Sequence, residues 1–83
     1  MGTMLRVQGI ITRIMPHVDQ GRVSRETTFD DLGPDSLERV EMVMAAEDEF
    51  GITIMEERAE DLRTVGDLVD LIEGELTRSA PTA

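Results

Sequence analysis

The fold is decided by one stretch of the sequence, residues 35–50, which reads DSLERVEMVMAAEDEF. Its apolar residues recur at three- and four-residue steps, which is the period of one helix face. Asp35 and Glu38 resemble a capping box at its start, and Gly51 follows as a stop signal. The stretch therefore predicts a helix in which Met42 falls off the inward stripe, and that stripe consists of Leu37, Val40, Val43, Met44 and Phe50.

The residues before this helix predict a first helix and a long connection. Apolar side chains from Met4 to Met15 follow the same three-and-four step, and Pro16 cannot continue a helix. Residues 16–35 are rich in Gly, Pro, Ser, Thr and Asp, and a loop of this length tends to be functional. Phe29 and Leu32 are expected to fold back and anchor it.

The residues after Gly51 predict a linker, a short helix and a final helix. Residues 52–55 form an apolar linker that places Ile52 or Ile54 in the core, and residues 56–61 form one or two helical turns. Thr64 and Asp67 mark the start of the last helix, and residues 78–83 are expected to form a frayed, flexible tail. The sequence thus predicts an all-α fold, a four-helix bundle of three longer helices and one short helix. It is expected to be a single domain over residues 1–83, with its core at about 4–77.

Composition excludes several classes of protein. The net charge is -10, and residues 26–61 hold thirteen acidic residues against Arg39 and Arg58. Such a field repels nucleic acid and anionic membranes and attracts basic protein surfaces. There is no cysteine and no apolar run of the roughly 20 residues that span a bilayer. The first residues lack the layout of a signal peptide, so a cytoplasmic location without membrane insertion is expected.

Ser36 is the candidate functional residue. It lies in the first turn of the predicted helix, where free N–H groups and the helix dipole favour an attached phosphate. His17 is the only histidine and lies in the connecting loop, so no Ser–His–Asp arrangement is indicated. Residues 30–41 also fail the calcium-loop pattern, which requires oxygen ligands and a glycine at set positions. We therefore expect no metal and no catalytic residue, and a Ser36 that another enzyme modifies.

The motif Asp35-Ser36-Leu37 matches the Asp-Ser-Leu signature of acyl carrier proteins, and the similarity extends over residues 27–76. The chain resembles the discrete, type II members of this family. The resemblance implies a right-handed four-helix bundle and a 4′-phosphopantetheine ester on Ser36, added by a phosphopantetheinyl transferase. Acyl groups would be carried as thioesters on the terminal thiol and presented to fatty-acid or related biosynthesis enzymes.

The resemblance also implies roles for other residues. A monomer is expected, with ketosynthases, acyltransferases and other acyl-processing enzymes docking through basic surfaces. Their recognition would involve Asp35, Leu37, Glu41, Met44, Glu47 and Asp48. A core of small, flexible side chains is expected to open for an acyl chain, and the residues expected to line this pocket are Val7, Phe29, Val40, Ile54, Ala59, Leu62, Leu68 and Ile72.

Four positions depart from the family pattern and leave the pathway open. Pro34 stands where a small residue is usual, and Met55 where the linker usually ends in proline. Met42 stands where leucine is usual, and Arg39 places a positive charge in the recognition helix. A carrier of polyketide or aminoacyl intermediates is therefore an alternative to a fatty-acid carrier. An acidic helical interaction domain without a prosthetic group is the alternative from another class.

Overall fold

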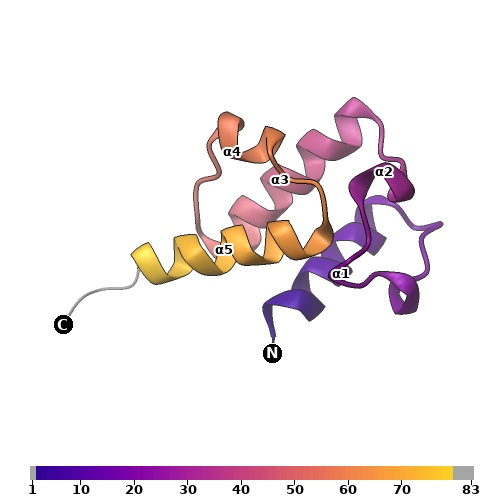
Figure 1. Ribbon diagram of the computed structural model, residues 1–83, viewed down its shortest axis with the longest axis horizontal. Coiled ribbons are helices and arrows are strands. Elements are labelled where there is room, and N and C mark those ends of the chain that lie inside the picture. The colour runs from indigo at the N-terminus through magenta and orange to yellow at the C-terminus, as the bar shows by residue number, and fades with distance from the viewer. Residues whose placement is uncertain (1, 80–83) are drawn as a thin grey trace.

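The computed structural model describes residues 2–79, and Figure 1 shows a small bundle of helices. Three helices of 12 to 15 residues form its frame, and the remaining elements are short. In chain order the elements are α1 (Thr3–Ile14), the 3-10 turn η1 (Gln20–Arg22), α2 (Phe29–Leu32), α3 (Ser36–Phe50), α4 (Glu56–Glu60) and α5 (Val65–Ser79). The predicted fold class is confirmed, and α2 is an additional single turn within the predicted long connection.

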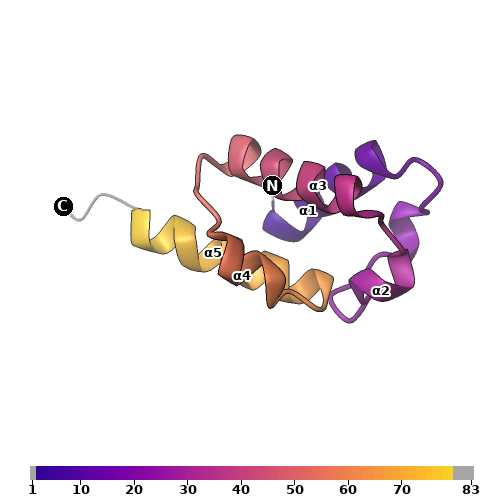
Figure 2. The same ribbon diagram turned by 90° about the horizontal axis from the view of Figure 1, so that it is seen from above.

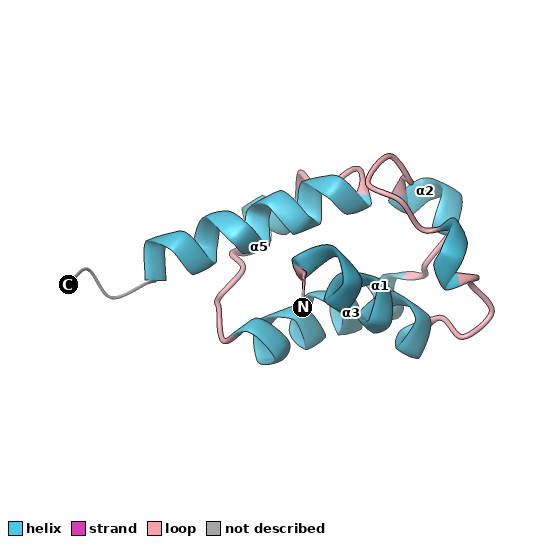
Figure 3. Ribbon diagram, turned by 90° about the horizontal axis from the view of Figure 1, so that it is seen from below, coloured by secondary structure: helices cyan, strands magenta, loops and turns pink. Residues whose placement is uncertain are grey.

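The arrangement in space brings the first and last helices of the described chain together. α1 packs against both α3 and α5, and α3 also contacts α5. Figure 2 shows α2 at one end of the molecule and the C-terminal end of α5 at the other. Figure 3 shows helices joined by loops and no strand within residues 2–79. No helix in this described part of the chain is long and apolar enough to cross a membrane.

The core is built from one face of each long helix and from the connections. Both Ile52 and Ile54 of the α3–α4 linker are buried, where the sequence predicted one of them. Each apolar side chain of this size contributes about 1.5–3 kcal/mol when it is removed from water. Within residues 2–79 the sixteen buried hydrophobic residues are Val7, Ile10, Ile11, Met15, Val23, Phe29, Met42, Ala46, Phe50, Ile52, Ile54, Val65, Leu68, Val69, Leu71 and Ile72.

The predicted inward stripe of α3 is correct for Phe50, which is buried, and wrong for three of its other members and for Met42. Met42 is 3% exposed and lies in the core, whereas Leu37, Val40 and Met44 are 67%, 53% and 57% exposed. The reason is that α3 carries two apolar stripes, and both follow helical spacing. Periodicity cannot choose between them; packing against α1 and α5 selects the stripe that contains Met42, Ala46 and Phe50.

The connection between α1 and α3 is fixed to the start of α5 by backbone hydrogen bonds. Phe29 N–H donates to the Arg63 carbonyl at 2.9 Å, and Val65 N–H donates to the Thr27 carbonyl at 2.8 Å. Thr28, which faces Thr64 in an isolated bridge, also caps α2 by accepting from Asp31 N–H at 3.0 Å. The long connection is therefore an ordered segment that shares a junction with α5.

Charged groups reinforce this junction. Arg25 donates to both carboxylate oxygens of Asp70 at 2.8 and 2.9 Å, and this hydrogen-bonded pairing raises the pKa of Arg25. Asp67 accepts hydrogen bonds from the backbone N–H groups of Thr64 and Arg63, and these bonds lower the pKa of Asp67. Both groups remain charged near neutral pH, so the ion pair and the cap of α5 coexist there.

The last helix is longer than predicted. α5 continues to Ser79, so Arg78 is helical and makes an ion pair of 3.3 Å with Glu75. The prediction that the tail includes residues 78 and 79 is therefore wrong. The rest of the predicted tail, residues 80–83, lies outside the described residues.

We expect Gly66→Ala to destabilise the fold at the junction between the connection and α5. An added Cβ would lie 2.9 Å from the Arg25 carbonyl oxygen and 3.1 Å from the Arg25 Cβ. That carbonyl accepts the Gly66 N–H at 2.9 Å, so relief of the contact would weaken the hydrogen bond. Overpacking of this kind lowers the free energy of unfolding by about 1–3 kcal/mol, which urea denaturation can measure.

Gly74→Ala is the matched control in the same helix. Nothing lies within 4 Å of a Cβ built at Gly74, so alanine should raise the free energy of unfolding by about 0.5–1 kcal/mol. Equal stabilisation by the two substitutions would contradict the close packing of Gly66.

Candidate functional site

Ser36 is placed by a sharp change of chain direction between α2 and α3. Gly33 ends α2 in the left-handed conformation, with φ 70°, and its N–H donates to the Phe29 carbonyl at 2.9 Å. This conformation favours glycine because a side chain would strain it. Pro34 and Asp35 complete the connection, and Ser36 is the first residue of α3. The serine therefore lies at an exposed helix start, as the sequence predicted.

The start of α3 is held by a reciprocal capping box. Glu38 N–H donates to the Asp35 carboxylate at 2.7 Å, and Asp35 N–H donates to the Glu38 carboxylate at 3.0 Å. The predicted pairing of these two residues is confirmed. Within residues 2–79 the Ser36 hydroxyl takes no part in these hydrogen bonds or in any other. The cap thus leaves the serine oxygen free for modification.

A groove of about 640 Å³ begins beside Ser36 and runs between α3 and α4. Its walls are mostly apolar, and its charged members are Arg39 on α3 and Glu56 and Glu60 on α4. Six of the eight predicted pocket residues line it, namely Phe29, Val40, Ile54, Ala59, Leu62 and Leu68. The other two, Val7 and Ile72, are fully buried in the closed core and do not line the groove.

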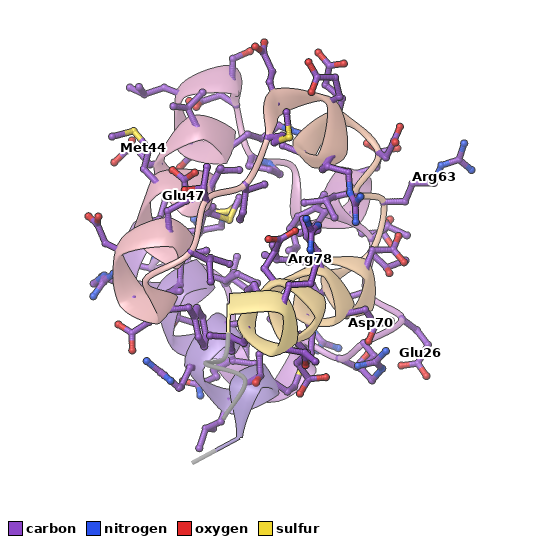
Figure 4. The ribbon with its side chains drawn as sticks, turned by 90° about the vertical axis from the view of Figure 1, so that its left-hand side faces the viewer. Glu26, Met44, Glu47, Arg63, Asp70 and Arg78 are labelled. Atoms are coloured by element: carbon purple, nitrogen blue, oxygen red, sulfur yellow. The ribbon has the colours of Figure 1, made fainter. Side chains whose placement is uncertain are left out.

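The residues predicted to recognise partners divide into two groups. Glu47 is half-buried, and its carboxylate accepts the Ile54 N–H at 2.8 Å, so it fixes the α3–α4 linker. Figure 4 shows Met44 at the outer edge of α3, away from the linker. The exposed members of the set, which form a surface along α3, are Asp35, Leu37, Glu41, Met44 and Asp48.

Sequence reasoning missed several residues of the groove. Met42 and Val43 line it together with Arg39. Met44, which the sequence placed on the inward stripe of α3, also lines the groove while facing solvent. Arg39 follows Ser36 by three positions, and residues at this spacing are neighbours on a helix surface. The three-residue spacing between Ser36 and Arg39 could therefore have identified Arg39 from the sequence. The other missed residues, Glu56 and Glu60, come from α4, and no local pattern links them to Ser36.

Comparison with known proteins places this architecture in an established class. The family described as "Phosphopantetheine attachment site" matches residues 6–72. A curated relative, acyl carrier protein 5 of the chloroplast of Arabidopsis thaliana, is 44% identical over 71 residues. The match covers 86% of this chain and 51% of the relative, so the chain spans about half the length of that protein.

Solved structures of acyl carrier proteins also resemble this chain. An acyl carrier protein from Thermotoga maritima is 33% identical with a TM-score of 0.79, over 90% of this chain and 87% of that chain. The hexanoyl form of the acyl carrier protein from the actinorhodin polyketide synthase of Streptomyces coelicolor is 26% identical. Its TM-score is 0.77, over 89% of this chain and 90% of that chain. This chain belongs to the phosphopantetheine attachment-site family and, within it, to the acyl carrier proteins.

Membership of this family gives the chain a covalently attached 4′-phosphopantetheine as its prosthetic group. The geometry around Ser36 fits such a group. The hydroxyl is exposed and makes no hydrogen bond within the described part of the chain, and a mostly apolar groove starts beside it. A helix start also favours a phosphate electrostatically. Covalent attachment thus needs no rearrangement of the core.

We expect Asp35→Ala and Ser36→Ala to differ in their effect on stability. Loss of the Asp35 side chain removes the N-cap of α3, which costs about 1 kcal/mol of the free energy of unfolding. Loss of the Ser36 hydroxyl removes no contact of the cap and should change that free energy by less than about 0.5 kcal/mol. Urea denaturation of the two unmodified variants beside the unmodified wild type measures both. An equal loss in the two variants would contradict the assignment of the cap to Asp35 alone.

Proposed function

We propose that this protein carries acyl intermediates as thioesters on a 4′-phosphopantetheine arm attached at Ser36, and presents them to enzymes of fatty-acid or related biosynthesis. The observation that carries the proposal is the exposed Ser36, whose free hydroxyl lies at the start of α3 beside the groove. The interaction domain without a prosthetic group, weighed from the sequence, is set aside because the chain belongs to the phosphopantetheine attachment-site family.

The chain is a carrier and not an enzyme in this proposal. The Ser36 oxygen forms the ester bond to the phosphorus of the arm, while the pyrophosphate bond of coenzyme A breaks and the nucleotide half of coenzyme A leaves. The serine proton passes to a base of the modifying transferase. Within residues 2–79 no side chain accepts a hydrogen bond from that hydroxyl, so the chain offers no general base in place. The arm, once attached, supplies a terminal thiol that forms the thioester. Activation of Ser36 and acyl transfer therefore belong to partner enzymes.

The partners are proposed from charge and exposure. Asp35, Glu41 and Asp48 are exposed acidic residues on α3, and Leu37 and Met44 expose apolar surface on the same helix. A surface with this composition fits basic docking surfaces with an apolar centre. The partners proposed are a phosphopantetheinyl transferase, ketosynthases, acyltransferases and other acyl-processing enzymes. The protein is proposed to meet them as a monomer.

The pathway proposed first is fatty-acid biosynthesis, because the glutamate-rich continuation after Ser36 favours that type of carrier. A carrier of polyketide intermediates is the second candidate. It is supported by the shared fold with a carrier of the actinorhodin polyketide synthase, at 26% identity. Loading by the cognate acyl-transferring enzymes of each pathway distinguishes the two candidates.

The groove between α3 and α4 is proposed as the place where the acyl chain is sheltered. Its apolar lining includes Val40, Ala59 and Leu68, and its volume is about 640 Å³. Each CH₂ group that leaves water for such a site contributes about 0.8 kcal/mol. A chain of medium length therefore gains enough free energy to offset the ordering of its bonds.

We expect Ser36→Ala to abolish attachment of the arm and Ser24→Ala to leave it intact. Ser24 is the matched control because it is also exposed, but it lies in the connection and hydrogen-bonds to Thr27. The measurement is intact mass after incubation with coenzyme A and a phosphopantetheinyl transferase proven on another carrier. A mass gain in Ser36→Ala, or a wild type that gains none, would overturn the proposal.

We expect an octanoyl group on the arm to raise the melting temperature by roughly 10 °C relative to the arm alone. Burial of a few CH₂ groups supplies a few kcal/mol, and about 1 kcal/mol shifts the melting temperature of a domain this size by about 4–8 °C. Val40→Asp places a charge on the groove wall and should remove most of this increment. Leu5→Asp is the control, because Leu5 is 48% exposed, Val40 is 53% exposed, and Leu5 does not line the groove.

Two outcomes would contradict a sheltered chain. One is an equal melting temperature for the acylated and unacylated wild type. The other is the same loss of the increment in the Val40 and Leu5 variants, because that would place the effect outside the groove.

A further inference from the structure

Arg39 is a charged residue beside Ser36 whose role in the site the fold does not explain. It lies one helical turn after Ser36 on α3, and both residues line the same groove. Its guanidinium carbon lies 6.0 Å from the centre of the Phe29 ring. That distance is the outer limit of a cation–π contact, so Phe29 holds the guanidinium only weakly.

Arg39 is also unusual among the arginines of residues 2–79. Only Arg6 and Arg39 are half-buried, and the other arginines are exposed. Arg6 pairs with the Glu49 carboxylate at 2.9 Å and contacts the Phe50 ring at 4.3 Å. Arg39, in contrast, has no carboxylate within 4.0 Å in this part of the chain. Among the described residues, therefore, no carboxylate engages the five N–H donors that Arg39 holds beside the mostly apolar groove.

The direction of helical side chains brings Arg39 toward Ser36. Every Cα–Cβ bond of a helix tilts toward the N-terminus, so a long side chain covers the turn that precedes its own Cα. For Arg39 that turn contains Ser36. The contact with Phe29, the first residue of α2, agrees with this direction, because Phe29 and Ser36 line the same groove. The position of the guanidinium over the Phe29 ring therefore places it at the groove that begins beside Ser36.

The side chains around Ser36 are negatively charged, and this affects how a phosphate attached there is stabilised. Asp35 and Glu38 flank the serine, and the capping box holds both carboxylates at the helix start. A phosphodiester on Ser36 would add a third negative charge within one turn of helix. Like charges at such distances repel, and Arg39 is the cation on this helix that offsets them.

We propose that Arg39 binds the phosphodiester of the arm through paired N–H donors and so directs the arm into the groove between α3 and α4. Guanidinium groups bind phosphate oxygens with two parallel hydrogen bonds, which fix orientation as well as position. On attachment the guanidinium leaves its weak contact with Phe29 for the phosphate. The inference rests on the proposed attachment at Ser36, and it assigns Arg39 to the arm and not to a partner enzyme or the acyl chain.

The test compares the melting temperature before and after attachment of the arm, with the terminal thiol left free. We expect attachment of the arm to raise the melting temperature of the wild type by about 2–5 °C more than that of Arg39→Gln. Because each variant is compared with its own unmodified form, a general loss of stability caused by the substitution cancels. The weak Phe29 contact, which the wild type gives up on attachment, can only lower the wild-type increment. Arg39→Lys keeps the charge without the paired donors, so its change in melting temperature on attachment should lie between those of the wild type and Arg39→Gln. Arg78→Gln is the charge-matched control, since Arg78 lies near the C-terminal end of α5, far from α2 (Figure 1).

The second readout is the ³¹P resonance of the modified proteins. We expect the phosphodiester signal of the wild type to shift as salt is raised to about 1 M, where exposed charges are screened. In Arg39→Gln the signal should already lie at the high-salt position. An equal thermal increment in the wild type and Arg39→Gln, together with equal ³¹P signals, would overturn the inference.

Two further results separate the inference from its alternatives. An Arg39 effect that arises only after an acyl group with a carboxylate or keto oxygen is loaded would overturn it in favour of contact with the acyl chain. A wild type that gains no mass at Ser36 would overturn the proposed attachment, and this inference with it. A normal mass gain without any Arg39 effect would overturn the inference alone.

Discussion

The capping box at the start of α3 is the interaction on which the functional site depends. Asp35 and Glu38 satisfy each other's backbone N–H groups, and the helix can therefore begin at Ser36 without using the serine hydroxyl. Had Ser36 been the N-cap, its oxygen would have been engaged in the helix start. The Asp35 side chain caps the helix, and the hydroxyl of the adjacent Ser36 remains free. Stability of the helix start and modification of the serine are therefore expected to depend on different side chains.

α3 contacts three different environments, namely the core, the solvent and the groove. Met42 and its neighbours one and two turns on face the core, Leu37 and Glu41 face solvent, and Arg39 and Val40 line the groove. A helix with apolar residues on more than one face is typical of an element that is buried on one side and bound on another. The exposed apolar side chains of α3 are therefore consistent with docking and not with a defect of packing.

The parts of this arrangement that could be predicted are those fixed by local chemistry. The capping box needs only Asp35 and Glu38 in sequence, and the stop at Gly51 needs only a residue that tolerates a φ of 66°. The burial of Met42 in place of Val40 could not be predicted, because both belong to stripes with helical spacing and the choice is made by distant helices. The turn of α2 escaped prediction for the same reason, since Thr28 lies in a junction with residues at the start of α5.

One wall of the groove, the short helix α4, makes few buried contacts with the rest of the molecule. α4 has five residues, none of them buried, and its N-cap Met55 provides no side-chain hydrogen bond. It is held to the core through the half-buried Ala59 and Leu62 and through the ends of its two connections. Segments with few buried contacts open at the lowest free-energy cost, whereas α3 is fixed by its cap and by its packing on α1 and α5. In the proposed function, an acyl chain enlarges the groove by displacing α4, while Ser36 and the proposed docking surface on α3 stay in place for partner enzymes.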